Sequence, residues 1–132
     1  MPVPKGSTKA FVVNGRANTT NANPKTKEWQ SRIALAGQQA REDSYIPKTN
    51  RGDDGVGIVA VFRFPRPQSD RRCRRLHTVK PDLDKLVRTI GDALTGVMFD
   101  DDSQIISICA TKEYCDDCAP HVEVTIHCIQ QS

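Results

Sequence analysis

Residues 80–104 read KPDLDKLVRTIGDALTGVMFDDDSQ, and this stretch contains one helical pattern with a group of carboxylates at each end. Its apolar residues recur at the three- and four-residue spacing of a helix: Leu83, Leu86, Val87, Ile90, Ala93, Leu94 and Val97. This unbroken stripe predicts an amphipathic helix over residues 83–97 with one face in the core, and Gly96 marks its expected end.

The segment before this stretch predicts a strand and a first helix. Residues 3–13 contain short β-prone pieces and end at the turn signal Asn14-Gly15. Residues 26–41 carry apolar side chains at helical spacing, and Thr26 is a suitable N-terminal cap. We therefore expect a strand followed by a helix.

Three further patterns predict strands. Residues 56–64 are nearly apolar on both faces, which is typical of a strand in the centre of a sheet. Residues 104–111 and 121–128 alternate in polarity, which favours two antiparallel strands joined by a polar turn at 115–120. The order β-α-β-α-β-β predicts an α+β fold, a mixed sheet of about four strands with two main helices packed on it.

Charge is divided unevenly along the chain. Residues 1–80 hold 16 basic against 6 acidic side chains, a balance of +10, whereas residues 81–132 hold 3 against 10, a balance of −7. A basic part can bind phosphates and an acidic part can bind cations. The alternative is that the two parts simply form solvated ion pairs with each other.

Size and composition restrict the class of protein. A chain of 132 residues with 37% hydrophobic content fits one globular domain over residues 1–132. No apolar run approaches the roughly 20 residues of a membrane span, and the first residues lack the apolar segment of a secretion signal. The odd number of five cysteines favours reduced thiols, so we expect a cytoplasmic protein without membrane attachment.

The two acidic groups are the candidate functional feature. An extended entry through Lys80-Pro81 would let Asp82 and Asp84 face the same way at the mouth of the helix, where the backbone favours negative groups. The alternative is an N-cap residue followed by a first-turn acid. The aspartates at 100–102 follow the helix, and an oxygen-only set drawn from both groups is suited to a hard cation such as Mg²⁺.

Three segments carry a family resemblance: His77-x-x-Lys80-Pro-Asp-x-Asp84-x-Leu, then Gly91-Asp-Ala-Leu94, then Asp101-Asp-Ser-Gln104. Together they closely resemble the RusA family of Holliday junction resolvases, most strongly over residues 77–112. The resemblance implies a RusA-like fold and a homodimeric, Mg²⁺-dependent endonuclease, with Mn²⁺ as an alternative ion. It implies branched DNA as the partner, in particular a four-way junction cut in paired steps during recombination and repair, and a phage or prophage setting.

The resemblance also implies the site residues. The metal ligands would be Asp82, Asp84 and Asp102, with Asp101 in a supporting role. Two positions depart from the family pattern. Lys85 stands where the family commonly has asparagine, and Arg88 stands where a catalytic lysine is usual. Arg88 can contact phosphate and pair with Asp84 one turn away, but it does not exchange protons at ordinary pH.

Basic residues upstream of the helix are the candidate DNA contacts: Arg71, Arg72, Arg74, Arg75 and Lys80, with Lys85, Lys5 and Lys9 as further candidates. Contacts of this kind make affinity fall steeply with salt. An exposed arginine-rich loop without such a role is the simpler alternative.

Two other functions remain open on the sequence. The departures at Lys85 and Arg88 are also compatible with a non-catalytic protein that binds branched DNA on the same fold. The Cys115-Asp-Asp-Cys118 motif, with His121 nearby, provides half of a structural zinc site, although a turn with reduced thiols is the simpler interpretation.

Overall fold

The structure is a computed structural model that describes residues 8–15, 24–43, 55–66, 76–78 and 80–129. Within them the elements follow the predicted order. They are β1 (Thr8–Asn14), α1 (Pro24–Asp43), β2 (Gly55–Pro65), α2 (Leu83–Leu94), the short 3₁₀ helix η1 (Asp102–Gln104), β3 (Ile105–Cys115) and β4 (His121–Ile129).

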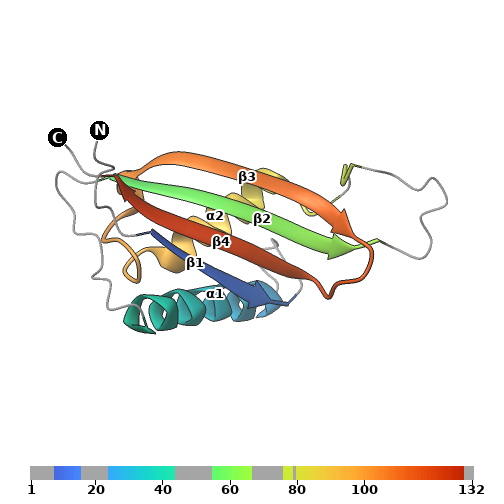
Figure 1. The fold of residues 1–132 in the computed structure, drawn as a ribbon, viewed down its shortest axis with the longest axis horizontal. Helices are drawn as coiled ribbons and strands as arrows, with labels where there is room; N and C mark the ends of the chain where they lie inside the picture. The colour runs from blue at the N-terminus through green and yellow to red at the C-terminus, as the bar shows by residue number, and fades with distance from the viewer. Residues whose placement is uncertain (1–7, 16–23, 44–54, 67–75, 79, 130–132) are drawn as a thin grey trace.

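The described strands form one mixed sheet in the order β1-β4-β2-β3. β2 lies inside it, antiparallel to β4 and parallel to β3, as its apolar sequence predicts. Helix α2 connects β2 to β3 and packs behind the sheet, while α1 lies along β1 (Figure 1). The predicted α+β class with a mixed four-stranded sheet and two helices is confirmed.

The predicted pairing of the last two strands is wrong. β3 and β4 run in opposite directions but are not neighbours, because β2 lies between them. Most apolar side chains of β2 are buried, which is typical of a strand with a hydrogen-bonded neighbour on each side. The five residues between β3 and β4 have only two strand spacings to cross, about 10 Å.

The core lies between the sheet and the helices. The fully buried side chains of α2 are those that the stripe predicts, Leu86, Ile90 and Leu94, and they pack with Phe62 of β2 and Ile33 of α1. The whole α2 segment is therefore held firmly at the sheet, and its two ends have defined positions.

Both helices differ from the prediction at an end. Helix α2 stops at Leu94, because Thr95 has extended backbone (φ −63°, ψ 126°) and donates hydrogen bonds from its backbone N–H and its hydroxyl to the carbonyl of Gly91. Helix α1 begins at Pro24 instead of Thr26, since proline lacks an N–H that the first turn would leave unbonded.

Candidate metal centre and nucleic-acid interface

The N-terminal end of α2 presents two exposed carboxylates. Asp82 is the N-cap residue with extended backbone (φ −73°, ψ 136°), but its side chain forms no capping hydrogen bond. Asp84 follows in the first turn, and both side chains are exposed. The predicted position at the helix mouth is confirmed. The N-cap alternative explains where Asp82 lies, but its carboxylate does not bond to the helix backbone.

A basic side chain from β3 holds the backbone just before Asp82. Lys112 donates a hydrogen bond from its Nζ to the carbonyl oxygen of Pro81, at 2.8 Å. The peptide bond between Lys80 and Pro81 is cis. Sequence reasoning missed Lys112, because one lysine in an alternating strand gives no sign of what it contacts.

Lys85 pairs with one of the two carboxylates. Its Nζ lies 3.6 Å from Oδ2 of Asp82, and both side chains are about half exposed. The expected ion pair between Asp84 and Arg88 is not formed, although both residues lie in the described part of α2. Lys80 is also exposed, so three basic side chains of this segment are accessible at or near the start of α2.

The second acidic group is organised by local hydrogen bonds. The buried Gln104 accepts hydrogen bonds at its Oε1 from the backbone N–H groups of Asp100 and Asp101, each at 2.9 Å. Ser103 donates its hydroxyl to the carboxylate of Asp101, which caps η1. The carboxylate of Asp101 therefore has a structural role, because it stabilises the turn that leads into η1. Asp102 is exposed and forms no ion pair or hydrogen bond through its carboxylate with another described residue.

The two acidic groups lie at opposite ends of α2 within one chain. The 12 residues of α2 span about 18 Å. In β3, the seven residue-to-residue steps from Ile105, which follows η1, to Lys112, which contacts Pro81, span about 23 Å. Two ligands of one Mg²⁺ ion must lie within about 4–5 Å of each other, since each bond is about 2.1 Å. One chain therefore does not bring Asp102 to Asp82 and Asp84.

Among the described residues, no group of three or more His, Cys, Asp or Glu side chains is placed to hold a metal ion. This agrees with the separation along α2. It also leaves the Cys115–Cys118 turn without the further ligands that a zinc site needs.

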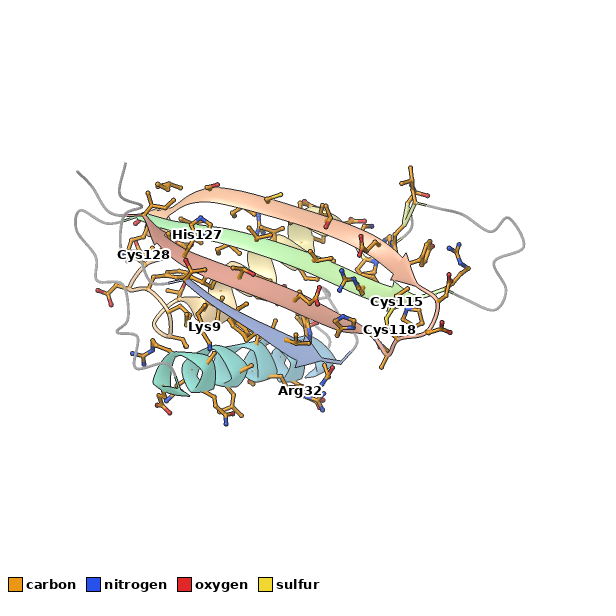
Figure 2. The ribbon with its side chains drawn as sticks, in the orientation of Figure 1. Lys9, Arg32, Cys115, Cys118, His127 and Cys128 are labelled. Carbon is orange, nitrogen blue, oxygen red and sulfur yellow. A yellow bond between two sulfur atoms is a disulfide. The ribbon has the colours of Figure 1, made fainter. Side chains whose placement is uncertain are left out.

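The predicted reduced thiols at 115 and 118 are wrong. Cys115 and Cys118 are joined by a disulfide that closes the turn after β3, at one end of the sheet (Figure 2). A Cys-x-x-Cys spacing permits both states, and the sequence alone favoured thiols through the odd cysteine count. A disulfide removes both thiolates that zinc would bind.

Arg66 and His77, which lie before and after the arginine-rich stretch in the sequence, both contact Tyr114. Arg71, Arg72, Arg74 and Arg75 lie outside the described residues, as does Lys5. Arg66, before the stretch, stacks 4.8 Å from the ring centre of Tyr114 and pairs with Asp116 at 3.2 Å. His77, after the stretch, is buried with its ring centre 4.6 Å from that of Tyr114 and 4.7 Å from that of Phe64.

Tyr114 follows Lys112 by two residues on β3, so the flanks of the arginine-rich stretch lie at the same end of the sheet as Asp82. Lys9 does not. It lies on β1, at the opposite edge of the sheet (Figure 2). Three strand spacings, about 14 Å in all, separate β1 from β3. Lys9 therefore belongs to a separate part of the surface.

Exposed carboxylates can bind a divalent metal ion, and lysine and arginine side chains can bind phosphate groups. The model of the endodeoxyribonuclease RusA family matches residues 1–127, so the chain belongs to the RusA family, whose members are nucleases that act on branched DNA. The chain is also similar to YqaN of Bacillus subtilis (strain 168), an uncharacterized protein. The two are 29% identical over 135 residues, which cover 95% of this chain and 89% of the relative.

No described helix is long and apolar enough to span a membrane.

Proposed function

We propose that this chain is a Mg²⁺-dependent endonuclease that resolves four-way DNA junctions by paired phosphodiester hydrolysis. The observation that carries the proposal is the exposed pair Asp82 and Asp84 at the start of α2, in a chain that matches the family over residues 1–127. Mn²⁺ would serve in place of Mg²⁺, because both accept oxygen ligands.

The residues present fit such an ion. The carboxylate of Asp82 is not used as a cap, and that of Asp102 has no described partner, so oxygen donors are accessible at both ends of α2. The ion would supply charge neutralisation at the scissile phosphate and activation of a water molecule. Asp82, Asp84 and Asp102 would hold it, while Lys85 and Arg88 would contact phosphate oxygens by charge alone.

The ligand set is completed by a second copy of the chain. Because one chain keeps Asp102 about 20 Å from Asp82, each site would combine Asp82 and Asp84 of one copy with Asp102 of the other. A two-fold symmetric dimer then contains two equivalent sites. Two sites suit a junction that must be cut on two strands.

DNA would reach the site along the basic segments that precede α2. The flanks of the arginine-rich stretch are fixed at Tyr114, near Lys112 and the start of α2. Arg71, Arg72, Arg74 and Arg75, together with Lys80, would contact backbone phosphates beside the scissile bond. Such contacts position the DNA without selecting a sequence.

The direct test is cleavage of a synthetic four-way junction with and without Mg²⁺. The proposal predicts paired nicks that require the ion and cease on addition of EDTA. The competing function is a non-catalytic protein that binds branched DNA. It is favoured by the ion pair of Lys85 with Asp82 and by an arginine, Arg88, at the position where the family usually has a lysine. Tight, EDTA-insensitive binding without nicks at any Mg²⁺ or Mn²⁺ concentration would establish that alternative.

Lys85→Asn should lower the Mg²⁺ concentration needed for half-maximal cleavage. The ammonium group of Lys85 competes with Mg²⁺ for the carboxylate of Asp82. Because exposed ion pairs are weak, losing this one should lower the required Mg²⁺ concentration about two- to fivefold. A Mg²⁺ titration of the cleavage rate measures it. Lys27→Asn, at an exposed position on α1, removes the same charge elsewhere and controls for weaker DNA binding. A higher Mg²⁺ requirement in Lys85→Asn would contradict the competition.

Lys112→Met should lower kcat for junction cleavage about tenfold and leave KM nearly unchanged, because it frees the backbone before Asp82 but keeps the aliphatic stem. Lys112→Arg retains a donor and should recover part of the rate. Steady-state kinetics of both variants, with thermal melting to confirm folding, provide the measurement. An equal loss in both variants, or a change in KM alone, would show that the hydrogen bond to Pro81 does not position Asp82.

A further inference from the structure

A groove lies between β1 and α1, at the edge of the sheet opposite β3. It measures about 290 Å³ and is lined by residues 9–12 of β1 and by Ala36, Gln39 and Ala40 of α1. β1 forms this margin of the described sheet, and α1 lies just outside it (Figure 1). Ala36 and Ala40 are one helical turn apart and carry only methyl groups, which leaves space between the helix and the strand.

β1 is open on the side of the groove. Among the described strands its hydrogen-bonded neighbour is β4, on its other side. In an antiparallel pair every second residue directs its N–H and C=O groups away from the partner strand. A helix bonds its own backbone groups internally, so α1 does not take the place of a neighbouring strand. β1 therefore offers a row of alternating backbone donors and acceptors along the groove.

Lys9 gives the groove a positive charge. Because strand side chains alternate, Lys9 shares the helix-facing side of β1 with Phe11, which packs against the core (Figure 2). The side chain of Lys9 is half-buried and forms no ion pair with another described residue. Apolar side chains, those of Phe11, Ala36 and Ala40, line the groove beside it. This combination suits a ligand that carries a negative charge next to an apolar group.

We propose that this groove binds an extended peptide segment of another protein, which adds to the sheet as a strand beside β1. The segment places an apolar side chain across from Phe11 and an acidic side chain across from Lys9, two positions apart. Main-chain hydrogen bonds at a sheet edge, with pockets for alternate side chains, are a recurrent way of binding extended peptides. The proposal goes beyond the nuclease function and does not rest on it.

The size and chemistry of the groove favour a peptide over other ligands. Pockets that enclose small molecules measure about 300–1,000 Å³, so this groove fits one or two side chains better than a whole cofactor. A DNA strand is the other extended candidate, but Lys9 is the one charged side chain among the described lining residues. The edge of β1 alternates donors and acceptors as a peptide backbone does, whereas phosphates only accept hydrogen bonds.

The test uses a fluorescein-labelled peptide, Thr-Glu-Thr-Val-Thr-Glu-Thr. Glutamate flanks valine on both sides, so either strand direction places one glutamate across from Lys9 when valine lies across from Phe11. Fluorescence anisotropy should show saturable binding with a Kd below about 1 mM. Lys9→Glu should weaken binding about fivefold or more, because an attraction becomes a repulsion. A peptide with lysine in place of both glutamates should reverse the preference and bind Lys9→Glu more tightly than the unmodified chain.

Ala36→Phe tests the space in the groove, because the larger side chain fills the position of the peptide valine. It should weaken binding about tenfold. Ser31→Phe, at an exposed position of α1 outside the lining, adds the same side chain and should bind like the unmodified chain. Thermal melting checks that both variants fold.

A proline peptide tests strand addition on the unmodified chain, even if Ala36→Phe does not fold. Thr-Glu-Pro-Val-Pro-Glu-Thr keeps the charges and the valine but cannot pair as a strand, so it should not bind. Equal binding of the two peptides would rule out strand addition.

Two further results would reject the proposal. One is the absence of saturable binding with valine, leucine or phenylalanine at the centre of the peptide. The other is a labelled single-stranded oligonucleotide whose binding is lost in Lys9→Glu and is not displaced by the peptide, which would assign the groove to DNA.

Discussion

Asp82→Asn should abolish junction cleavage while leaving junction binding intact. The substitution keeps the shape of the side chain and removes the negative charge that the ion requires. Loss of one preorganised electrostatic contact at a reaction centre commonly costs about 10²–10³-fold in rate, and loss of a direct metal ligand belongs at or above the upper end of that range. Single-turnover cleavage of a labelled junction in Mg²⁺ measures the rate.

Binding of the same junction, followed by fluorescence anisotropy in EDTA, should be unchanged or slightly tighter in Asp82→Asn, because one repulsive charge is gone. Glu42→Gln, at an exposed position on α1, removes one negative charge that belongs to neither acidic group and should behave like the unmodified chain. If Asp82→Asn cleaves at the rate of Glu42→Gln, Asp82 is not a metal ligand and the proposed chemistry is wrong.

Much of the fold follows from apolar spacing alone. The stripe along α2 correctly predicts that Leu86, Ile90 and Leu94 are buried, and the apolar run at 56–64 correctly predicts a central strand. Spacing along one strand states which side chains share a face but not which strand lies beside it. For this reason the alternating patterns predicted that β3 and β4 are neighbours, whereas β2 lies between them.

The candidate site was predicted only in part. Helix N-termini favour acids, so the location of Asp82 and Asp84 could be predicted from their place before the stripe. Contacts made by residues distant in the sequence could not. The hydrogen bond from Lys112 to Pro81 spans 31 residues. The stacking of Arg66 and His77 on Tyr114 depends likewise on how β2 and β3 pair.

The separation of the acidic groups has a physical origin in α2. A straight helix of 12 residues keeps its ends about 18 Å apart, and its buried stripe holds it against the sheet. Bending or shortening it would expose Leu86 and Ile90, at a cost of about 2 kcal/mol or more for each side chain. Assembly from two chains therefore requires less change than rearrangement of one.

Mixing two inactive variants tests this two-chain site most directly. Asp82→Asn and Asp102→Asn should each be inactive alone, with the loss in Asp102→Asn comparable to that in Asp82→Asn. When the two are unfolded together and refolded as a mixture, a mixed dimer contains one site with all three aspartates and one site with none at 82 and 102.

The measurement is the nicking rate of a four-way junction by the co-refolded mixture, compared with each variant refolded alone. We predict that the mixture recovers a substantial fraction of single-strand nicking, about a quarter of the sites of the unmodified protein for random pairing. A mixture as inactive as its two components, with mixed dimers demonstrated by differently tagged chains, would show that Asp82 and Asp102 do not act across two chains.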